Sequence, residues 1–177
     1  MSKTQIVSGG ITDDAVTATK IADAVALGKV AQVVTDSFTG TESSTSKATA
    51  DSFTDSSVAA SITPSATSSK IFVSCQINTG ATNYADGSHV GRFTQAISGG
   101  STTVVNVGAT AGNRIETSSG RGTESQGSNT LLNTHFSFVL SPSTTSAVTV
   151  TYQFACRGSD SSTAYINRTA DDGDNIE

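Results

Sequence analysis

Residues 131–140, L-L-N-T-H-F-S-F-V-L, alternate apolar and polar side chains over the length of one strand. Successive side chains of a strand point to opposite faces, so this alternation predicts a strand with one buried face. His135 falls on the other face, which is expected to point to solvent or to a neighbouring subunit. The residues predicted to share the buried face are Leu132, Thr134, Phe136, Phe138 and Leu140.

Two other segments alternate in the same way, S-K-I-F-V-S-C-Q-I-N at 69–78 and A-V-T-V-T-Y-Q-F-A-C at 147–156. Their predicted buried residues are Ile71, Val73, Cys75, Ile77, Val148, Val150, Tyr152, Phe154 and Cys156. Weaker candidate strands lie near 30–38, 57–62, 89–97, 102–107 and 163–168. These short strands, separated by Gly, Ser and Asn, predict an all-β fold, an antiparallel β-sandwich or jelly roll in which helices are minor.

Two polar stretches interrupt the strands, a Ser/Thr-rich one at 39–57 and a Gly-rich one at 108–129. We expect both to form long surface loops or irregular edge strands. Such loops either contact other subunits or have no role beyond connecting strands, and the sequence leaves both open.

The composition restricts the classes of function. Charged residues make up 14% of the chain and the formal net charge is −5, with no cluster of Lys or Arg to bind phosphates, so a nucleic-acid partner is not expected. No apolar run is long enough to cross a bilayer, and M-S-K-T-Q-I-V-S-G-G at 1–10 lacks the apolar centre of a signal peptide. We therefore expect no membrane partner, synthesis in the cytoplasm and reduced Cys75 and Cys156.

Residues 1–29 differ from the rest, because Ile6, Ile11, Val16 and Ile21 recur every five residues. A spacing of five matches neither a helix nor a flat strand, but it suits a chain wound around partner chains with one apolar residue per turn at a shared axis. A short amphipathic helix over 13–29 is the alternative. Under either interpretation this segment, the stem, needs a partner surface, and residues 30–177 form a separate head.

The chain offers few residues for catalysis or metal binding. His89 has Asp86 and Ser88 nearby in sequence, but no nucleophile-elbow motif accompanies them, so hydrolase activity is not expected. Cys75 and Cys156 lack metal-site spacing and are expected to be buried thiols that act as small apolar residues. We expect no catalytic residues, no metal and no cofactor.

Two short motifs have weaker interpretations. The segment D-D-G-D-N-I-E at 171–177 lacks the spacing of a calcium loop and is expected to be a solvated acidic tail, with weak calcium binding as the alternative. Asn167-Arg168-Thr169 matches a glycosylation acceptor, which has meaning only in a secreted eukaryotic protein.

Four further segments are informative together: G-G-I-T-D-D-A-V-T-A-T-K-I-A-D at 9–23, S-I-T-P-S-A-T-S-S-K-I-F-V-S at 61–74, A-G-N-R-I at 111–115 and S-T-A-Y-I-N-R-T at 162–169. In these segments the chain resembles short tail-fibre and capsid decoration (cement) proteins of tailed bacteriophages. The resemblance implies a non-enzymatic homotrimer with a jelly-roll head. Similar chains commonly continue into a final apolar strand where this one has its acidic tail, so the strand order is left open.

The expected function is therefore that of a virion structural protein, with two alternatives. As a capsid decoration, cement or short fibre protein it would form homotrimers and dock on the major capsid or tail protein of the same particle through its stem and loops. As a receptor-binding tail fibre it would contact host-surface glycans, for which the chain has only Tyr84, Tyr152 and Tyr165 and no Trp. A bacterial surface adhesin is disfavoured by the missing signal peptide.

Overall fold

The computed structural model describes residues 30–49, 52–82, 88–109, 112, 115–120, 131–157 and 162–170. The chain divides into two units, Met1–Val33 and Val34–Glu177, and the second contains every described strand. The predicted stem residues Ile6, Ile11, Val16 and Ile21 lie outside the described residues, as do 171–177. The boundary between a stem at 1–29 and a head at 30–177 stays a prediction.

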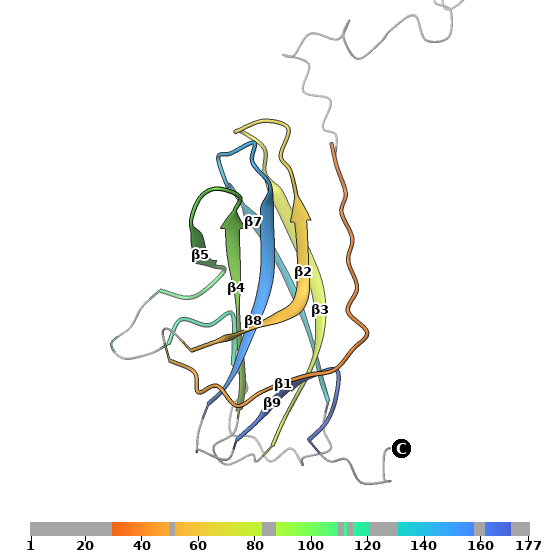
Figure 1. The fold of residues 1–177 in the computed structure, drawn as a ribbon, viewed down its shortest axis with the longest axis vertical. Coiled ribbons are helices and arrows are strands. Elements are labelled where there is room, and N and C mark those ends of the chain that lie inside the picture. The colour runs from red at the N-terminus through yellow and green to blue at the C-terminus, as the bar shows by residue number, and fades with distance from the viewer. Residues whose placement is uncertain are drawn as a thin grey trace, which may run out of the picture. The chain divides into compact units, whose positions relative to one another are not determined.

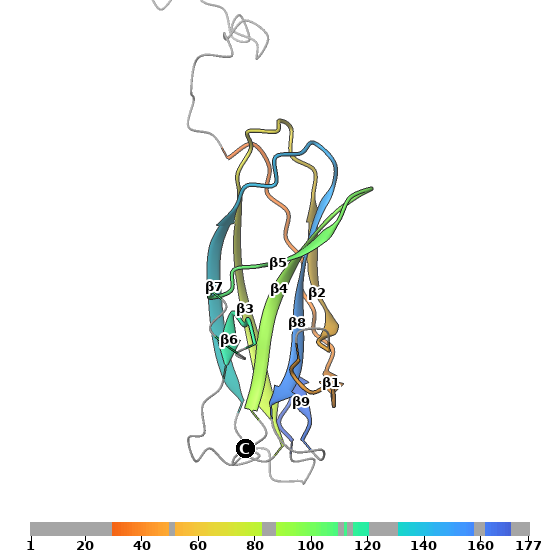
Figure 2. The same cartoon turned by 90° about the vertical axis from the view of Figure 1, so that its left-hand side faces the viewer.

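The described residues form two antiparallel sheets packed face to face and contain no helix (Figures 1 and 2). The first sheet has the order β1-β9-β3-β7, and the second has the order β2-β8-β4-β5 with β6 paired to β4. The predicted all-β antiparallel sandwich is confirmed. The strands are β1 (Glu42–Ser44), β2 (Thr54–Ile62), β3 (Ile71–Ala81), β4 (Ser88–Ile97), β5 (Thr102–Val105), β6 (Ser119–Gly120), β7 (Leu132–Leu140), β8 (Val148–Arg157) and β9 (Ala164–Ile166).

The strand pairs are nested along the chain. β1 pairs with β9, β2 with β8, β3 with β7 and β4 with β5, all antiparallel. The first and third of these pairs lie in one sheet and the second and fourth in the other, so the chain crosses between the sheets repeatedly. Contacts between residues far apart in sequence therefore define this fold.

The core lies between the two sheets and follows the predicted alternation. Phe93 is its central ring, with ring centroids 5.1 Å from Phe136 and 5.2 Å from Tyr152. Phe154 is fully buried, Phe136 is 7% exposed, and Phe138 is only partly buried. The predicted inner face of β3, β7 and β8 is thus confirmed, except that Leu132, at the start of β7, is exposed. The main cluster consists of Ile77, Phe93, Phe136, Tyr152, Phe154, Cys156, Ala164 and Ile166.

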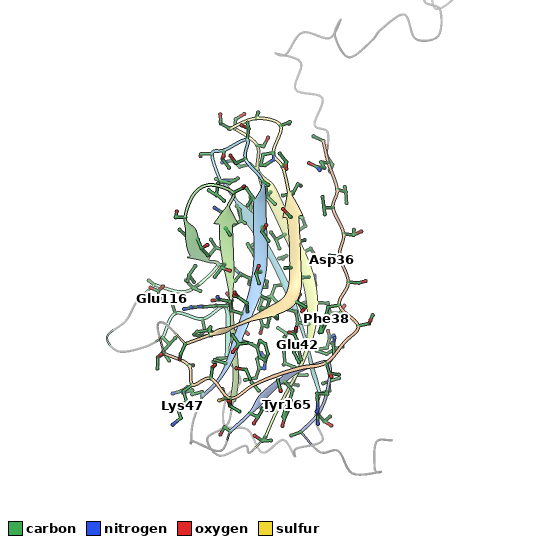
Figure 3. All side chains as sticks on the ribbon, viewed as in Figure 1. Asp36, Phe38, Glu42, Lys47, Glu116 and Tyr165 are labelled. Carbon is green, nitrogen blue, oxygen red and sulfur yellow. The ribbon has the colours of Figure 1, made fainter. Side chains whose placement is uncertain are left out.

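A carboxylate joins the two sheets at the β1 side of the sandwich. β2 has an irregular register between Asp55 and Ala59, which takes Ser57 out of the regular ladder. Glu42 of β1, labelled in Figure 3, accepts hydrogen bonds from the backbone N–H of Ser57 at 3.0 and 3.2 Å. The side chain from one sheet thus satisfies a backbone donor that the other sheet leaves unpaired.

The sequence-based strand assignment is wrong in one place and incomplete in two. Residues 30–38 form no strand, and Val30 and Val33 are 79% and 74% exposed (the orange segment before β1 in Figure 1). No described strand pairs with this segment. Conversely, the short polar strands β1 and β6 lie within the stretches 39–57 and 108–129. They form because they pair with β9 and β4, respectively, and not because of their own composition.

Candidate assembly surface

The outer face of β3 and β7 over residues 72–78 and 133–139 is exposed except at the half-buried Asn78, and it carries no Asp, Glu, Lys or Arg. Four cross-strand pairs form it: Phe72 with Val139, Ser74 with Ser137, Gln76 with His135, and Asn78 with Asn133. We call these eight residues the neutral face. Its lack of formal charge is typical of the centre of a protein–protein interface, where charged residues are depleted.

One end of the neutral face is apolar. Phe72 is 68% exposed and Val139, directly opposite on β7, is 60% exposed. These are the two most exposed large apolar side chains on the described strands. Opposed aromatic and β-branched side chains form a continuous apolar spot on a sheet, and a spot of this kind gains free energy when it is covered.

The rest of the neutral face is an ordered polar row. The Ser74 hydroxyl and His135 Nε2 share a hydrogen bond of 3.1 Å, and Asn133 Nδ2 donates to Asn78 Oδ1 at 2.6 Å. His135 is exposed, as the sequence predicts for the outer side of its strand. Hydrogen bonds between neighbouring side chains hold them in place, which lowers the entropy lost when a partner binds.

β7 is the last strand of the first sheet, and within the described residues no strand lies along its other side. It is nine residues long and contains no Lys or Pro, the residues that commonly protect an edge from pairing with another chain. Within the part of the chain that the structure describes, the neutral face therefore ends at an unprotected strand edge.

The other end of the first sheet is covered by the chain itself. A Cβ at Gly80 would lie 2.3 Å from the carbonyl oxygen of Arg168, so the backbone after β9 crosses closely over β3 there. The Arg168 guanidinium lies 4.8 Å from the centre of the Tyr165 ring. Tyr165, labelled in Figure 3, is half-buried, so it does not offer the free ring that a sugar site needs.

The second sheet also has part of its outer face covered by its own chain. Arg92 of β4 is 8% exposed, donates to Gln153 at 2.8 Å and lies 4.0 Å from the centre of the Phe53 ring. Gln153 in turn donates to Asp55 at 2.6 Å. The end of the 39–57 stretch thus packs on its own sheet.

His89 is a core residue. It is 3% exposed, stacks on the rings of Tyr152 and Phe154, and shares a 3.0 Å hydrogen bond with the Tyr152 hydroxyl. Asp86 and the Ser88 side chain, which stand near it in sequence, lie outside what the structure describes. Among the described residues, no group of three or more His, Cys, Asp or Glu could hold a metal ion.

The two cysteines are free thiols in different surroundings. Cys156 is fully buried, its Sγ–H lies within hydrogen-bond distance of the Ser46 and Ser162 carbonyls, and burial raises its pKa. Cys75 is only partly buried, although burial still raises its pKa to about 11. The expectation of two buried thiols thus holds fully for Cys156 and in part for Cys75. A raised pKa keeps both in the unreactive thiol form at neutral pH.

Asn167 has a structural role. Its Nδ2 donates to the carbonyl oxygens of Phe38 and Gly40, each at 3.0 Å, and its own φ is +56°. The side chain thereby ties the segment before β1 to the end of β9. An amide held in this way is not presented to solvent as a glycosylation acceptor would be.

No described helix is long and apolar enough to cross a membrane. Comparison of the chain with protein-family models, with curated proteins and with solved structures gives no match.

Proposed function

We propose that this chain is a non-enzymatic structural protein of a bacteriophage particle, a homotrimeric capsid decoration, cement or short fibre protein. The sequence resemblance to such proteins suggests the class. The neutral face is the observation that carries the proposal, because an uncharged sheet surface ending in the exposed Phe72–Val139 pair and an unprotected edge suits assembly with other chains.

We further propose that the sandwich is a jelly roll. In that arrangement an antiparallel ribbon wraps around a core, so the outermost strands pair with each other and the inner pairs follow in turn. The nested pairs β1–β9, β2–β8, β3–β7 and β4–β5 have this order. The closing strand would then be β9, and the acidic segment 171–177 need not supply one.

The stem and the head are proposed to have different roles in assembly. The stem, 1–29, supplies Ile6, Ile11, Val16 and Ile21 for packing around a common axis and docks on the major capsid or tail protein together with loops of the head. Three copies wound around that axis would bury these apolar residues against one another. No cofactor, nucleic acid or membrane takes part.

The test is the position of the protein on the particle. Antibodies raised against the purified chain would be added to purified phage particles and examined by electron microscopy. Regular labelling of the shell or of a fibre supports the proposal, whereas labelling confined to the host-contacting tip favours a receptor-binding fibre. Particles that carry no label and contain none of the chain by mass spectrometry would overturn it.

A further inference from the structure

We propose that the neutral face is the surface through which the heads of neighbouring copies of this chain contact one another. The inference rests on the proposed self-association and names the residues responsible, which lie in the sandwich rather than in the stem.

The first argument is the exposed apolar pair. Elsewhere on β3 and β7, apart from the exposed Leu132 at the start of β7, the large apolar side chains point inward, where Ile77 and Phe136 are almost fully buried. Phe72 and Val139 break this rule on the same outer face, at directly paired positions, so the apolar spot extends across both strands. A second molecule that covers the spot removes it from water.

The second argument is charge, and it identifies the partner. The chain carries a formal net charge of −5, so two copies repel each other wherever their acidic residues meet. Contact through the neutral face keeps those carboxylates at the periphery, where salt screens them. A basic partner would gain nothing from this face, since it offers no anionic group, whereas an equally uncharged surface of a second copy fits it.

The third argument is geometry. The face includes β7, whose outer edge is unprotected within the described part of the chain, so a neighbouring copy can cover the face and the edge together. Copies arranged with this face toward a common axis bring Phe72 and Val139 of each molecule into one cluster. The hydrogen-bonded pairs Ser74–His135 and Asn78–Asn133 then extend from one side of that cluster as the polar part of the contact.

The experiment compares full-length variants by light scattering over a wide concentration range. Phe72→Asp and Val139→Asp place a carboxylate on the neutral face, and Phe72→Thr removes the ring without adding charge while keeping a strand-forming residue. Ser61→Asp is the matched control, because Ser61 is an exposed strand residue on the outer face of the second sheet. Circular dichroism and thermal unfolding establish that each variant folds.

We expect the two Asp variants to raise the concentration at which the oligomer half-dissociates by about tenfold or more, Phe72→Thr to act in the same direction, and Ser61→Asp to behave as wild type. An oligomer that tolerates all three substitutions overturns the inference while self-association stands. Variants that stay associated but fail to attach to particles show that the face binds a particle protein instead, which also overturns it. If the wild-type protein is a monomer at the highest concentration, both the contact through the neutral face and the homotrimer are refuted. This holds wherever electron microscopy places the protein on the particle.

Discussion

The hydroxyl of Tyr152 on β8 lies directly against the backbone of Gly91 on the neighbouring strand β4. A Cβ placed on Gly91 would be 1.8 Å from that oxygen and 2.3 Å from the ring carbon that bears it. The hydroxyl also meets His89 Nε2, and Tyr152 is 1% exposed, so the ring has no open space into which it could move. Glycine is therefore required at position 91 by the packing of the ring.

Substitution Gly91→Ala is accordingly expected to destabilise the fold strongly. The added methyl group overpacks the core and forces the ring or strand β4 to shift, at a cost of about 3 kcal/mol. Urea unfolding followed by fluorescence or circular dichroism measures this. Gly108→Ala is the control, because no atom lies within 4 Å of its Cβ position; equal stability of the two variants would show that the Tyr152 ring can move aside.

The two faces of β7 are expected to respond oppositely to truncation. Phe136→Ala and Phe154→Ala each remove a buried ring and should cost roughly 3–5 kcal/mol, with a smaller loss for the partly buried Phe138. His135→Ala removes only an exposed hydrogen bond to Ser74 and should change stability by no more than about 0.5 kcal/mol.

Urea unfolding at several protein concentrations checks this second prediction, since dissociation makes apparent stability depend on concentration. The comparison is made at the lowest concentration, where contacts between copies contribute least. A disruptive His135→Ala combined with a neutral Phe136→Ala would mean that the strand faces are reversed.

Alkaline pH should destabilise the protein through its buried thiols. Burial raises the pKa of Cys75 from 9.0 to about 11, so the folded state keeps a proton that the unfolded state releases in this range. The thiol's contribution to stability is therefore complete below pH 9 and is lost as the pH rises toward 11. Burial also raises the pKa of Tyr152, which extends the decline to higher pH.

The measurement is the free energy of unfolding between neutral pH and the onset of irreversible base damage. Cys75→Ala removes one titrating group, so its curve should fall less steeply above pH 9 than that of the wild type. Coincident slopes for the two proteins would show that Cys75 is not protonated preferentially in the folded state.

Removal of residues 1–29 is expected to abolish docking on the particle and to leave the sandwich folded. Every described strand belongs to the unit Val34–Glu177, so the deletion removes no part of either sheet. Circular dichroism tests the fold, and binding to particles stripped of the protein tests docking. Decoration at wild-type occupancy by the shortened chain would assign the anchor to the loops of the head.

The sequence predicts strands well where the alternation is long and apolar. The segments 69–78 and 131–140 become β3 and β7 with the predicted inner faces, because a sandwich buries one face of each strand and selects that pattern. The weaker candidate at 30–38, V-A-Q-V-V-T-D-S-F, forms no strand. Whether such a short segment forms a strand depends on pairing with a neighbouring strand. The composition of the segment alone does not reveal which strand, if any, lies beside it.

The same limit applies to the candidate surface. The alternation places Phe72 and Val139 on the outer faces of their strands, but only the register between β3 and β7 brings the two side chains opposite each other. His89 shows the converse case. Its sequence neighbours suggest a possible triad, whereas tertiary packing against Tyr152 and Phe154 makes it part of the core.

The central claim is that this chain assembles with itself to build part of a particle, and the mass of the native protein tests it most directly. Native mass spectrometry or sedimentation of the full-length chain at micromolar concentration should show a species of three times 17.9 kDa. That species should dissociate on strong dilution, and at higher concentrations when its contacts are weakened. A single species of 17.9 kDa at this concentration would contradict the account.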